Sequence, residues 1–186
     1  MRFMLFLQNS SYQPNDSLWL KKKARELASV GEITIRDTRV SRFHVEYDIS
    51  IPDYDKITTA AYMFRDIGDY LSSYHVIEKR RGKKEAISEA KCYFNEEKYW
   101  IAHEILESIW KESKGLEKEL IGGIILVCAA YVHYQKAEEE ICISILRRAI
   151  KKLNNAKGTY YDFDVDKIKD RICDVISSGK PTVFRT

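Results

Sequence analysis

Residues that interrupt regular structure are scarce in this sequence, which has three prolines and eight glycines among 186 residues. Such a composition argues against long disordered segments. The sequence also has no run of about 18 apolar residues, so we expect no transmembrane helix. The longest apolar stretch, residues 121–132, is too short for one and predicts a buried helix. We expect no signal peptide, because the N-terminal apolar run is short and no small-residue cleavage site follows it.

Cysteines at metal-binding spacing are absent as well. The four cysteines each fall within a helical pattern, at Cys92, Cys128, Cys142 and Cys173. Free cysteines are among the most often buried residues, and disulfides are rare in cytosolic proteins. We therefore expect four reduced, buried thiols in a cytoplasmic protein.

The sequence also has neither a large excess of one charge nor any of the common nucleotide-binding motifs. With 31 basic and 28 acidic residues the net charge is +3, which by itself implies neither a nucleic-acid nor a membrane partner. Gly122 and Gly123 fall inside an apolar helical segment, and no glycine-rich loop leads into a helix that carries Lys and Ser or Thr. We therefore expect no cofactor.

The first 80 residues combine strand-like and helical apolar patterns. Strand-like alternation occurs in residues 2–8, 32–36, 42–51 and 70–78. Helical spacing follows the N-cap candidates at residues 15–17 and ends before Gly31, and it occurs again in residues 54–67. The order β-α-β-β-α-β predicts a ferredoxin-like lobe over residues 1–80.

From residue 83 onward the apolar spacing is helical almost throughout. Helices are predicted at about residues 84–94, 97–113, 116–136, 138–155 and 164–178. Their short connections force neighbouring helices to run antiparallel. We therefore predict an α+β protein, in which the ferredoxin-like βαββαβ lobe is followed by an all-α helical-hairpin bundle over residues 84–178.

The first helical hairpin carries a long run of mixed chemistry. Its residues include Phe94, Asn95, Tyr99, Trp100, Ala102, His103, Glu104, Leu106, Glu107 and Trp110. In this register they resemble the signature of the uncharacterised all-helical family known as domain of unknown function 309. The next helix matches loosely at Gly122, Tyr131 and His133, while polar residues of the family are replaced by Ile101, Ile121 and Ile125. The resemblance covers about residues 84–155; it implies a helical bundle and no particular activity.

The same run brings an imidazole and two carboxylates within one helical turn. His103 and Glu107 are four residues apart and Glu104 is three from Glu107, so the side chains can converge on one helix face. Such a set can hold a transition metal, or act as a general base with its orienting partner. It is not the H-E-x-x-H motif of zinc peptidases, because Glu107 stands where that motif has its second histidine. His133 on the next helix could add a fourth group.

A structural role for these polar residues is the alternative. In a tight helical hairpin, His103 and Glu107 can bond to each other, to the Trp110 indole or to Tyr131. Tyr99 is expected to pack in the core. On this interpretation the polar network determines the packing and holds no metal.

Nucleic-acid binding is a further alternative. A basic cluster joins the two lobes, with Lys79, Arg80, Arg81, Lys83 and Lys84. The third strand argues against binding on the sheet. If its apolar residues Phe43, Val45 and Tyr47 pack on the helices, the open face carries His44, Glu46 and Asp48, and acidic side chains repel phosphate.

We therefore expect a non-catalytic binding or adaptor module with a polar His/Glu network in its bundle. Its partner is expected to be another protein or a second copy of the chain, because edge strands of a small sheet invite pairing. Two alternatives stay open: a metal-dependent enzyme that uses His103, Glu104 and Glu107, and nucleic-acid binding through the basic cluster. No membrane partner is expected.

Overall fold

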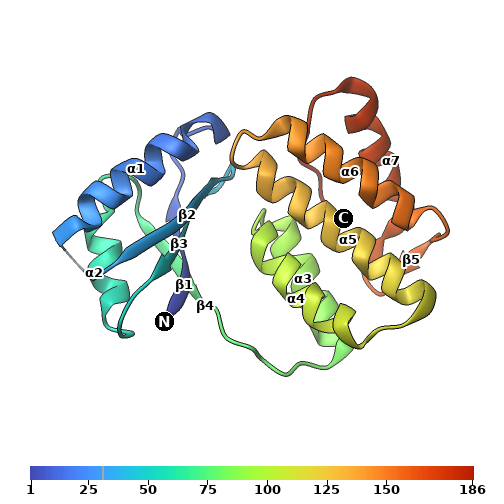
Figure 1. Cartoon of the computed structure of the whole chain (residues 1–186), viewed down its shortest axis with the longest axis horizontal. Coiled ribbons are helices and arrows are strands. Elements are labelled where there is room, and N and C mark those ends of the chain that lie inside the picture. Colours follow the sequence, from blue (N-terminus) through green and yellow to red (C-terminus); the bar gives the residue numbers. More distant parts are fainter. Residues whose placement is uncertain (31) are drawn as a thin grey trace. The chain divides into compact units, whose positions relative to one another are not determined.

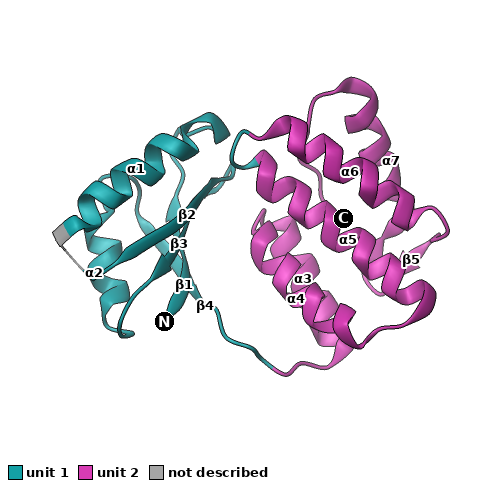
Figure 2. Cartoon of the chain, viewed as in Figure 1, with its two compact units in different colours: residues 1–79, 135–137 teal, residues 80–134, 138–186 magenta. Residues whose placement is uncertain are grey.

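The computed structural model describes residues 1–30 and 32–186. The chain divides into two compact units (Figure 2). Unit 1 comprises residues 1–79 and 135–137, and unit 2 comprises residues 80–134 and 138–186. An antiparallel sheet with helices is followed by a helical region (Figure 1), so the predicted α+β class is confirmed. The predicted helix end before Gly31 lies outside the described residues.

Unit 1 contains a four-stranded sheet and two α-helices. Its elements are β1 (Arg2–Gln8), η1 (Pro14–Asp16), α1 (Ser17–Leu27), η2 (Ala28–Val30), β2 (Thr34–Val40), β3 (His44–Ser50), α2 (Lys56–Met63) and β4 (Tyr70–His75). The strand order is β2-β3-β1-β4, and each neighbouring pair is antiparallel. Leu5 of β1 faces Tyr47 of β3 at the centre of the register. The two central strands of the sheet are therefore β1 and β3, the first and third strands of the chain.

One face of this sheet forms the core of unit 1 with both helices. Leu5 and Tyr47 are fully buried there, together with Leu20 of α1 and Ala60 of α2. Alternation along each strand places these apolar side chains on one face. Phe43 was expected on the same face, and that prediction was wrong: its side chain is 46% exposed. Phe43 precedes β3 and lies in the β2–β3 turn, where strand alternation no longer directs side chains inward.

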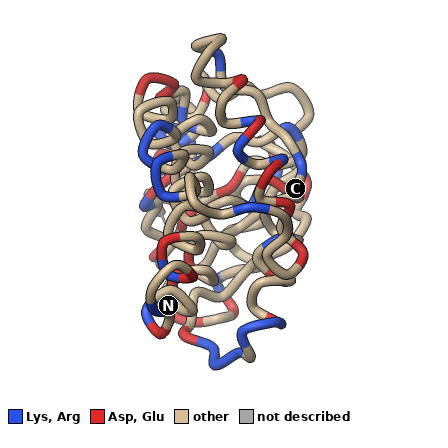
Figure 3. The backbone as a smooth tube through the Cα atoms, turned by 90° about the vertical axis from the view of Figure 1, so that its right-hand side faces the viewer, with Lys and Arg blue, Asp and Glu red and all other residues tan. Residues whose placement is uncertain are grey.

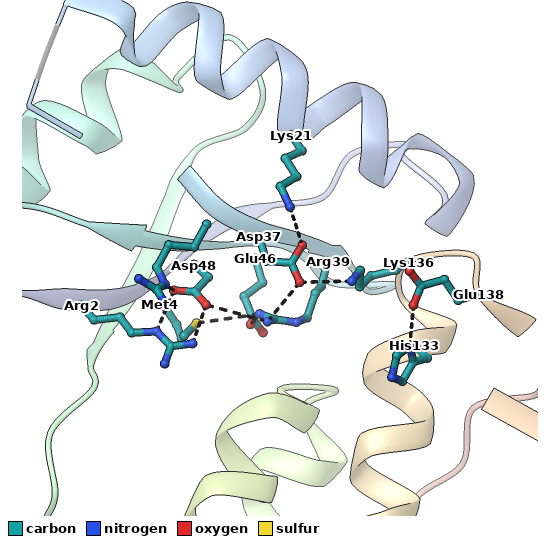
Figure 4. Close-up of polar contacts among 11 residues, drawn as sticks. Arg2, Met4, Lys21, Asp37, Arg39, Glu46, Asp48, His133, Lys136 and Glu138 are labelled. Atoms are coloured by element: carbon teal, nitrogen blue, oxygen red, sulfur yellow. Dashed lines mark hydrogen bonds and ion pairs between the residues drawn. The ribbon is translucent and has the colours of Figure 1, made fainter. Parts of the chain in front are cut away.

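The opposite face carries charged groups that are buried and paired, whereas we expected them to be open to solvent. His44, Glu46 and Asp48 are at most 3% exposed. Arg39 forms an ion pair with Glu46, and Arg2 donates two hydrogen bonds to Asp48, at 2.9 and 2.6 Å (Figure 4). Burial raises the pKa of Glu46, although the Arg39 guanidinium opposes that shift. These carboxylates are therefore internal structural groups of the folded chain.

Asp37 extends this charged cluster on β2. Its carboxylate lies 3.0 Å from the Lys21 ammonium and 3.3 Å from that of Lys136 (Figure 4). Burial acts to raise the pKa of Asp37, but Arg39, Lys21 and Lys136 lower it below its ordinary value. The carboxylate is therefore ionised at neutral pH and is neutralised by its neighbours.

Unit 2 consists of five α-helices, and a β-hairpin with two residues in each strand precedes the last helix. Its elements are α3 (Lys83–Asn95), α4 (Tyr99–Glu112), α5 (Gly115–Tyr134), α6 (Glu139–Leu153), β5 (Thr159–Tyr160), β6 (Phe163–Asp164) and α7 (Val165–Ser178). Neighbouring helices pack in chain order, α3 on α4, α4 on α5 and α5 on α6. The predicted helical hairpins are therefore present, with helix ends within two residues of the predicted ones.

Two of the four free thiols are buried and two are exposed. Cys128 and Cys142 are buried free thiols, as predicted, but Cys92 and Cys173 are exposed. Both exposed cysteines lie on the solvent faces of their amphipathic helices, a difference that the helical pattern alone did not reveal. None of the helices in residues 1–30 and 32–186 combines the length and apolar character that crossing a membrane requires.

Gly68 is required where the chain passes from α2 to β4. A Cβ atom at this position would lie 2.2 Å from the main-chain oxygen of Gln8. In the same contact the main-chain N–H of Gln8 donates to the main-chain oxygen of Asp69 at 2.7 Å. We expect Gly68→Ala to lower the free energy of unfolding by about 2–3 kcal/mol, because the backbone of β1 must shift. Gly82→Ala is the control, since a Cβ there meets no atom within 4 Å. Urea unfolding followed by circular dichroism measures both, and equal effects would contradict the steric explanation.

Candidate functional site

Helix α4 presents its polar signature residues on the side away from its packing face. The buried face consists of Tyr99, Ile101, Ala102, Ile105, Leu106 and Ile109, at helical spacing. Burial of these apolar side chains fixes the rotation of α4. His103, Glu104 and Glu107 consequently remain at least partly accessible. The His103 side chain is 28% exposed and the Glu104 side chain 40%.

These three side chains converge as the sequence predicts. Among the described residues they form a group of possible metal ligands, with one donor atom from each lying within 4.8 Å of the others. The His103 Nδ1 atom lies 3.5 Å from Glu104 Oε1, which is longer than an ordinary hydrogen bond. In the described part of the chain this Nδ1 has no hydrogen-bond partner, although the atom itself is buried. We call His103, Glu104 and Glu107 the His103 cluster.

Trp110 packs toward α5, and within the described residues it forms no hydrogen bond with this cluster. A Cβ atom at Gly122 would lie 3.2 Å from the indole nitrogen, so the absence of a side chain at Gly122 lets the ring approach the helix. The ammonium group of Lys118, which is also on α5, lies 4.4 Å from the centroid of the Trp110 ring. The Trp110 side chain thus contributes to the packing of α4 on α5.

His133 does not join the His103 cluster in the described structure. Its Nδ1 atom is bound to the Glu138 carboxylate across the α5–α6 turn (Figure 4). Both side chains are about one-third exposed. The predicted fourth group is therefore engaged elsewhere.

Tyr99 and Tyr131 belong to a buried aromatic cluster. Their rings are 5.0 Å apart, and Phe94 lies edge-on to Tyr99 at 5.0 Å. The Tyr131 hydroxyl donates to the main-chain oxygen of Thr182 at 2.7 Å. Burial raises the pKa of Tyr131 well above its ordinary value, so the hydroxyl stays a neutral donor. The prediction that Tyr99 packs in the core agrees with its complete burial.

Residues 87–145 match the family model described as "Domain of unknown function (DUF309)". The predicted resemblance is confirmed. The DUF309 segment, as we call residues 87–145, contains the His103 cluster, Trp110, both cluster tyrosines and His133. A comparison with curated proteins found no match. The similarity therefore identifies the segment in which the candidate residues lie, without an activity.

The basic cluster is partly neutralised by acidic residues of the helices. Arg81 lies 2.5 Å from Glu89, and Lys83 lies 2.9 Å from Glu117. Lys79 lies 5.5 Å from the centroid of the Tyr74 ring. Elsewhere basic and acidic residues are interspersed along the chain (Figure 3). Within the described residues, Arg80 and Lys84 are the members that form neither an ion pair nor a ring contact.

A cavity of about 310 Å³ lies between the first turn of α5 and the last turn of α6. Its lining includes Leu120, Lys151 and Tyr160, and no cavity was predicted there from the sequence. The Tyr160 hydroxyl donates to Glu117 at 2.8 Å. Hydrogen bonds from Lys83 and Tyr160 lower the pKa of Glu117. The lining residues come from segments more than thirty residues apart in the sequence, so no local sequence motif predicts this cavity.

The partners of Asn95 were not predicted from the sequence. Its side-chain amide donates to the main-chain oxygen of Thr186 at 3.3 Å, and its oxygen accepts from the Thr186 amide at 2.9 Å. Asn95 had been noted only as a signature residue at the end of a helix. The contact joins residues 91 positions apart, a separation that no spacing rule reveals.

The Tyr131 hydroxyl should stabilise unit 2 measurably. In Tyr131→Phe the main-chain oxygen of Thr182 loses its donor, so we expect the free energy of unfolding to fall by about 1 kcal/mol. Amide hydrogen exchange of residues 182–186 should accelerate in the same variant. Tyr62→Phe is the control, because the Tyr62 side chain is 67% exposed. Unchanged exchange in residues 182–186 would show that the hydroxyl does not hold them.

Proposed function

We propose that this protein is a non-catalytic binding module, and that the His103 cluster is the recognition site of its helical unit. The observation that supports this proposal is the buried His103 Nδ1 atom, which faces carboxylate oxygens without a hydrogen-bond partner among the described residues. A buried polar atom without a partner costs free energy. A ligand that bonds to this nitrogen would remove that cost.

A divalent transition-metal ion suits these donors best. Imidazole nitrogen and carboxylate oxygen together favour zinc and similar ions, which bind at about 2.0–2.2 Å. Ligands of one such ion lie closer together than the 4.8 Å limit of the cluster, so small side-chain rotations would close the site. The two carboxylates also balance the charge of the ion.

A metal-dependent enzyme is the second candidate, supported by the number of protein ligands. Three protein ligands leave one position of a tetrahedral zinc ion open, and a water there can become a nucleophile. This candidate requires turnover in addition to metal binding. Without turnover, the bound ion would serve recognition or structure.

Nucleic-acid binding receives less support from the geometry. Two of the five basic side chains are paired with Glu89 and Glu117. The acidic groups of the sheet are buried and cannot offer a phosphate-binding face. Binding through Arg80 and Lys84 would be weak and strongly dependent on salt concentration.

The partner and the location remain part of this proposal. Homodimerisation through the outer strand β4 is supported by its exposed residues Tyr70 and Leu71, since an open strand edge invites pairing. The ferredoxin-like classification of unit 1 is supported by its strand order. A cytoplasmic location is supported by the four free thiols.

Elemental analysis of protein purified without a histidine tag tests the metal proposal. We expect near-stoichiometric zinc or a similar ion after equilibration, and a more than about tenfold loss of affinity in His103→Ala and in Glu107→Gln, because each removes one ligand. His133→Ala is the matched control, since this histidine is bound to Glu138 in the same unit. It should retain the metal.

The spectrum of the cobalt-substituted protein provides an independent measurement, because it reports nitrogen and oxygen ligation directly. Absence of metal from wild type and variants alike would refute the proposal. Hydrolysis of model esters by the metal-loaded protein, abolished by His103→Ala, would favour the enzyme over the binding module.

A further inference from the structure

The cavity at one end of the helical unit has the lining of a small-molecule site. Its volume of about 310 Å³ is within the range of ligand pockets in proteins. The start of α5, the end of α6 and the hairpin strand β5 surround it, and all three belong to unit 2 (Figure 1). The described residues that line it include none of the His103 cluster. The cavity is therefore a separate place at which this unit can bind a ligand.

The apolar part of the lining remains accessible to solvent. It consists of Leu116 and Leu120 on α5 and of Ala156, which follows α6. The Leu116 side chain is 76% exposed, and the other two are partly buried. A ligand with an apolar body would remove this surface from water, which is favourable.

The carboxylates of the lining already have partners. Glu117 accepts hydrogen bonds from the Lys83 ammonium at 2.9 and 3.1 Å and from the Tyr160 hydroxyl at 2.8 Å. Glu119 accepts a hydrogen bond from Lys152 at 2.7 Å. A cationic ligand would have to compete with these donors, so the acidic side chains do not select for positive charge.

Two donor side chains of the lining are left over, those of Lys151 and Asn155. Within the described residues neither side chain forms a hydrogen bond or an ion pair, and both are exposed. An ammonium group and an amide group together offer several N–H donors, and a carboxylate has oxygens enough to accept from both. Because the charges of Glu117 and Glu119 are balanced by their lysine partners, the Lys151 charge is the one left unbalanced.

We propose that this cavity binds a small organic anion with a short apolar body, a class that medium-chain carboxylates represent. Leu116, Leu120 and Ala156 cover the apolar body. The Lys151 ammonium pairs with the carboxylate head, and the Asn155 amide donates a second hydrogen bond to it. This site goes beyond the proposed function, because it uses no residue of the His103 cluster and needs no metal.

Titration of the full-length, nitrogen-15-labelled protein with three eight-carbon probes tests the site by NMR. Octanoate, octanol and octylammonium share the apolar chain and differ in the head group, so they separate charge recognition from apolar contact. We expect octanoate to cause saturable shifts of the amide signals of residues 116–120 and 151–160. Its Kd should be at least about fivefold lower than that of octanol, because it gains an ion pair and a hydrogen bond. Octylammonium should bind more weakly than octanol.

Substitution of Lys151 tests recognition of the head group. Lys151→Met removes the charge and keeps an apolar stem, so the Kd of octanoate should rise about fivefold while that of octanol stays unchanged. Lys151→Arg retains the charge and should retain most of the affinity. Lys157→Met is the matched control, because Lys157 is exposed in the same part of the chain and is not part of the lining. This variant should bind octanoate as wild type does.

Substitution of Leu116 tests the apolar lining. Because this side chain is 76% exposed, Leu116→Ser should fold as wild type does. The Kd values of octanoate and octanol should both rise about threefold or more, since both probes lose the same apolar contact. Leu18→Ser is the matched control: Leu18 is 77% exposed and belongs to unit 1, so neither Kd should change.

The proposal would be overturned if octanoate left the amide signals of residues 116–120 and 151–160 unshifted. Equal or tighter binding of octylammonium would show a site for cations, and equal binding of octanol would show an apolar site without charge recognition; either result contradicts the proposal. Equal octanoate binding by wild type and Lys151→Met would also refute it. Metal binding by the His103 cluster is measured separately, so failure of one proposal leaves the other intact.

Discussion

The close approach of α5 to its neighbours is the constraint on which the helical unit depends. Two adjacent glycines provide it: a Cβ atom at Gly123 would lie 2.6 Å from Leu153 of α6, and one at Gly122 would lie 3.2 Å from the Trp110 indole of α4. Glycine inside a helix costs about 1 kcal/mol relative to alanine. The contacts with Leu153 and Trp110 offset that cost. Helix α5 can therefore pack closely on both sides, which positions α4.

The position of α4 places its apolar side chains in the core and its polar side chains on the other side of the helix. Its apolar face contributes Tyr99 to the aromatic cluster, whereas the polar face leaves the His103 cluster within reach of solvent. The aromatic cluster extends through Tyr131 to Phe184, whose ring centroid lies 5.6 Å from that of Tyr131. One short helix thus supports a polar group of possible ligands and part of a buried aromatic cluster, with no residue in common.

In unit 1, charged side chains on one face of the sheet are buried. Arg39 with Glu46, and Arg2 with Asp48, form pairs on a sheet face that strand alternation marked as polar. Alternation correctly separated polar from apolar side chains, but it carries no information on which face is covered. Pairing makes burial of these charges tolerable, since an unpaired buried charge would be far more costly. The same limit explains the exposed Phe43, whose place in a turn depends on where β3 begins.

The amino-acid sequence by itself determined the class of the fold, the order of its elements and the convergence of His103, Glu104 and Glu107. All of these follow from local periodicity, because residues three or four apart share a helix face and residues two apart share a strand face. Only the tertiary structure decided that His133 binds Glu138, that Asn95 holds Thr186 and that the charged sheet face is buried. These contacts join residues on different elements, or depend on the conformation of a turn. Their geometry arises from the packing of whole helices and strands, which local spacing does not encode.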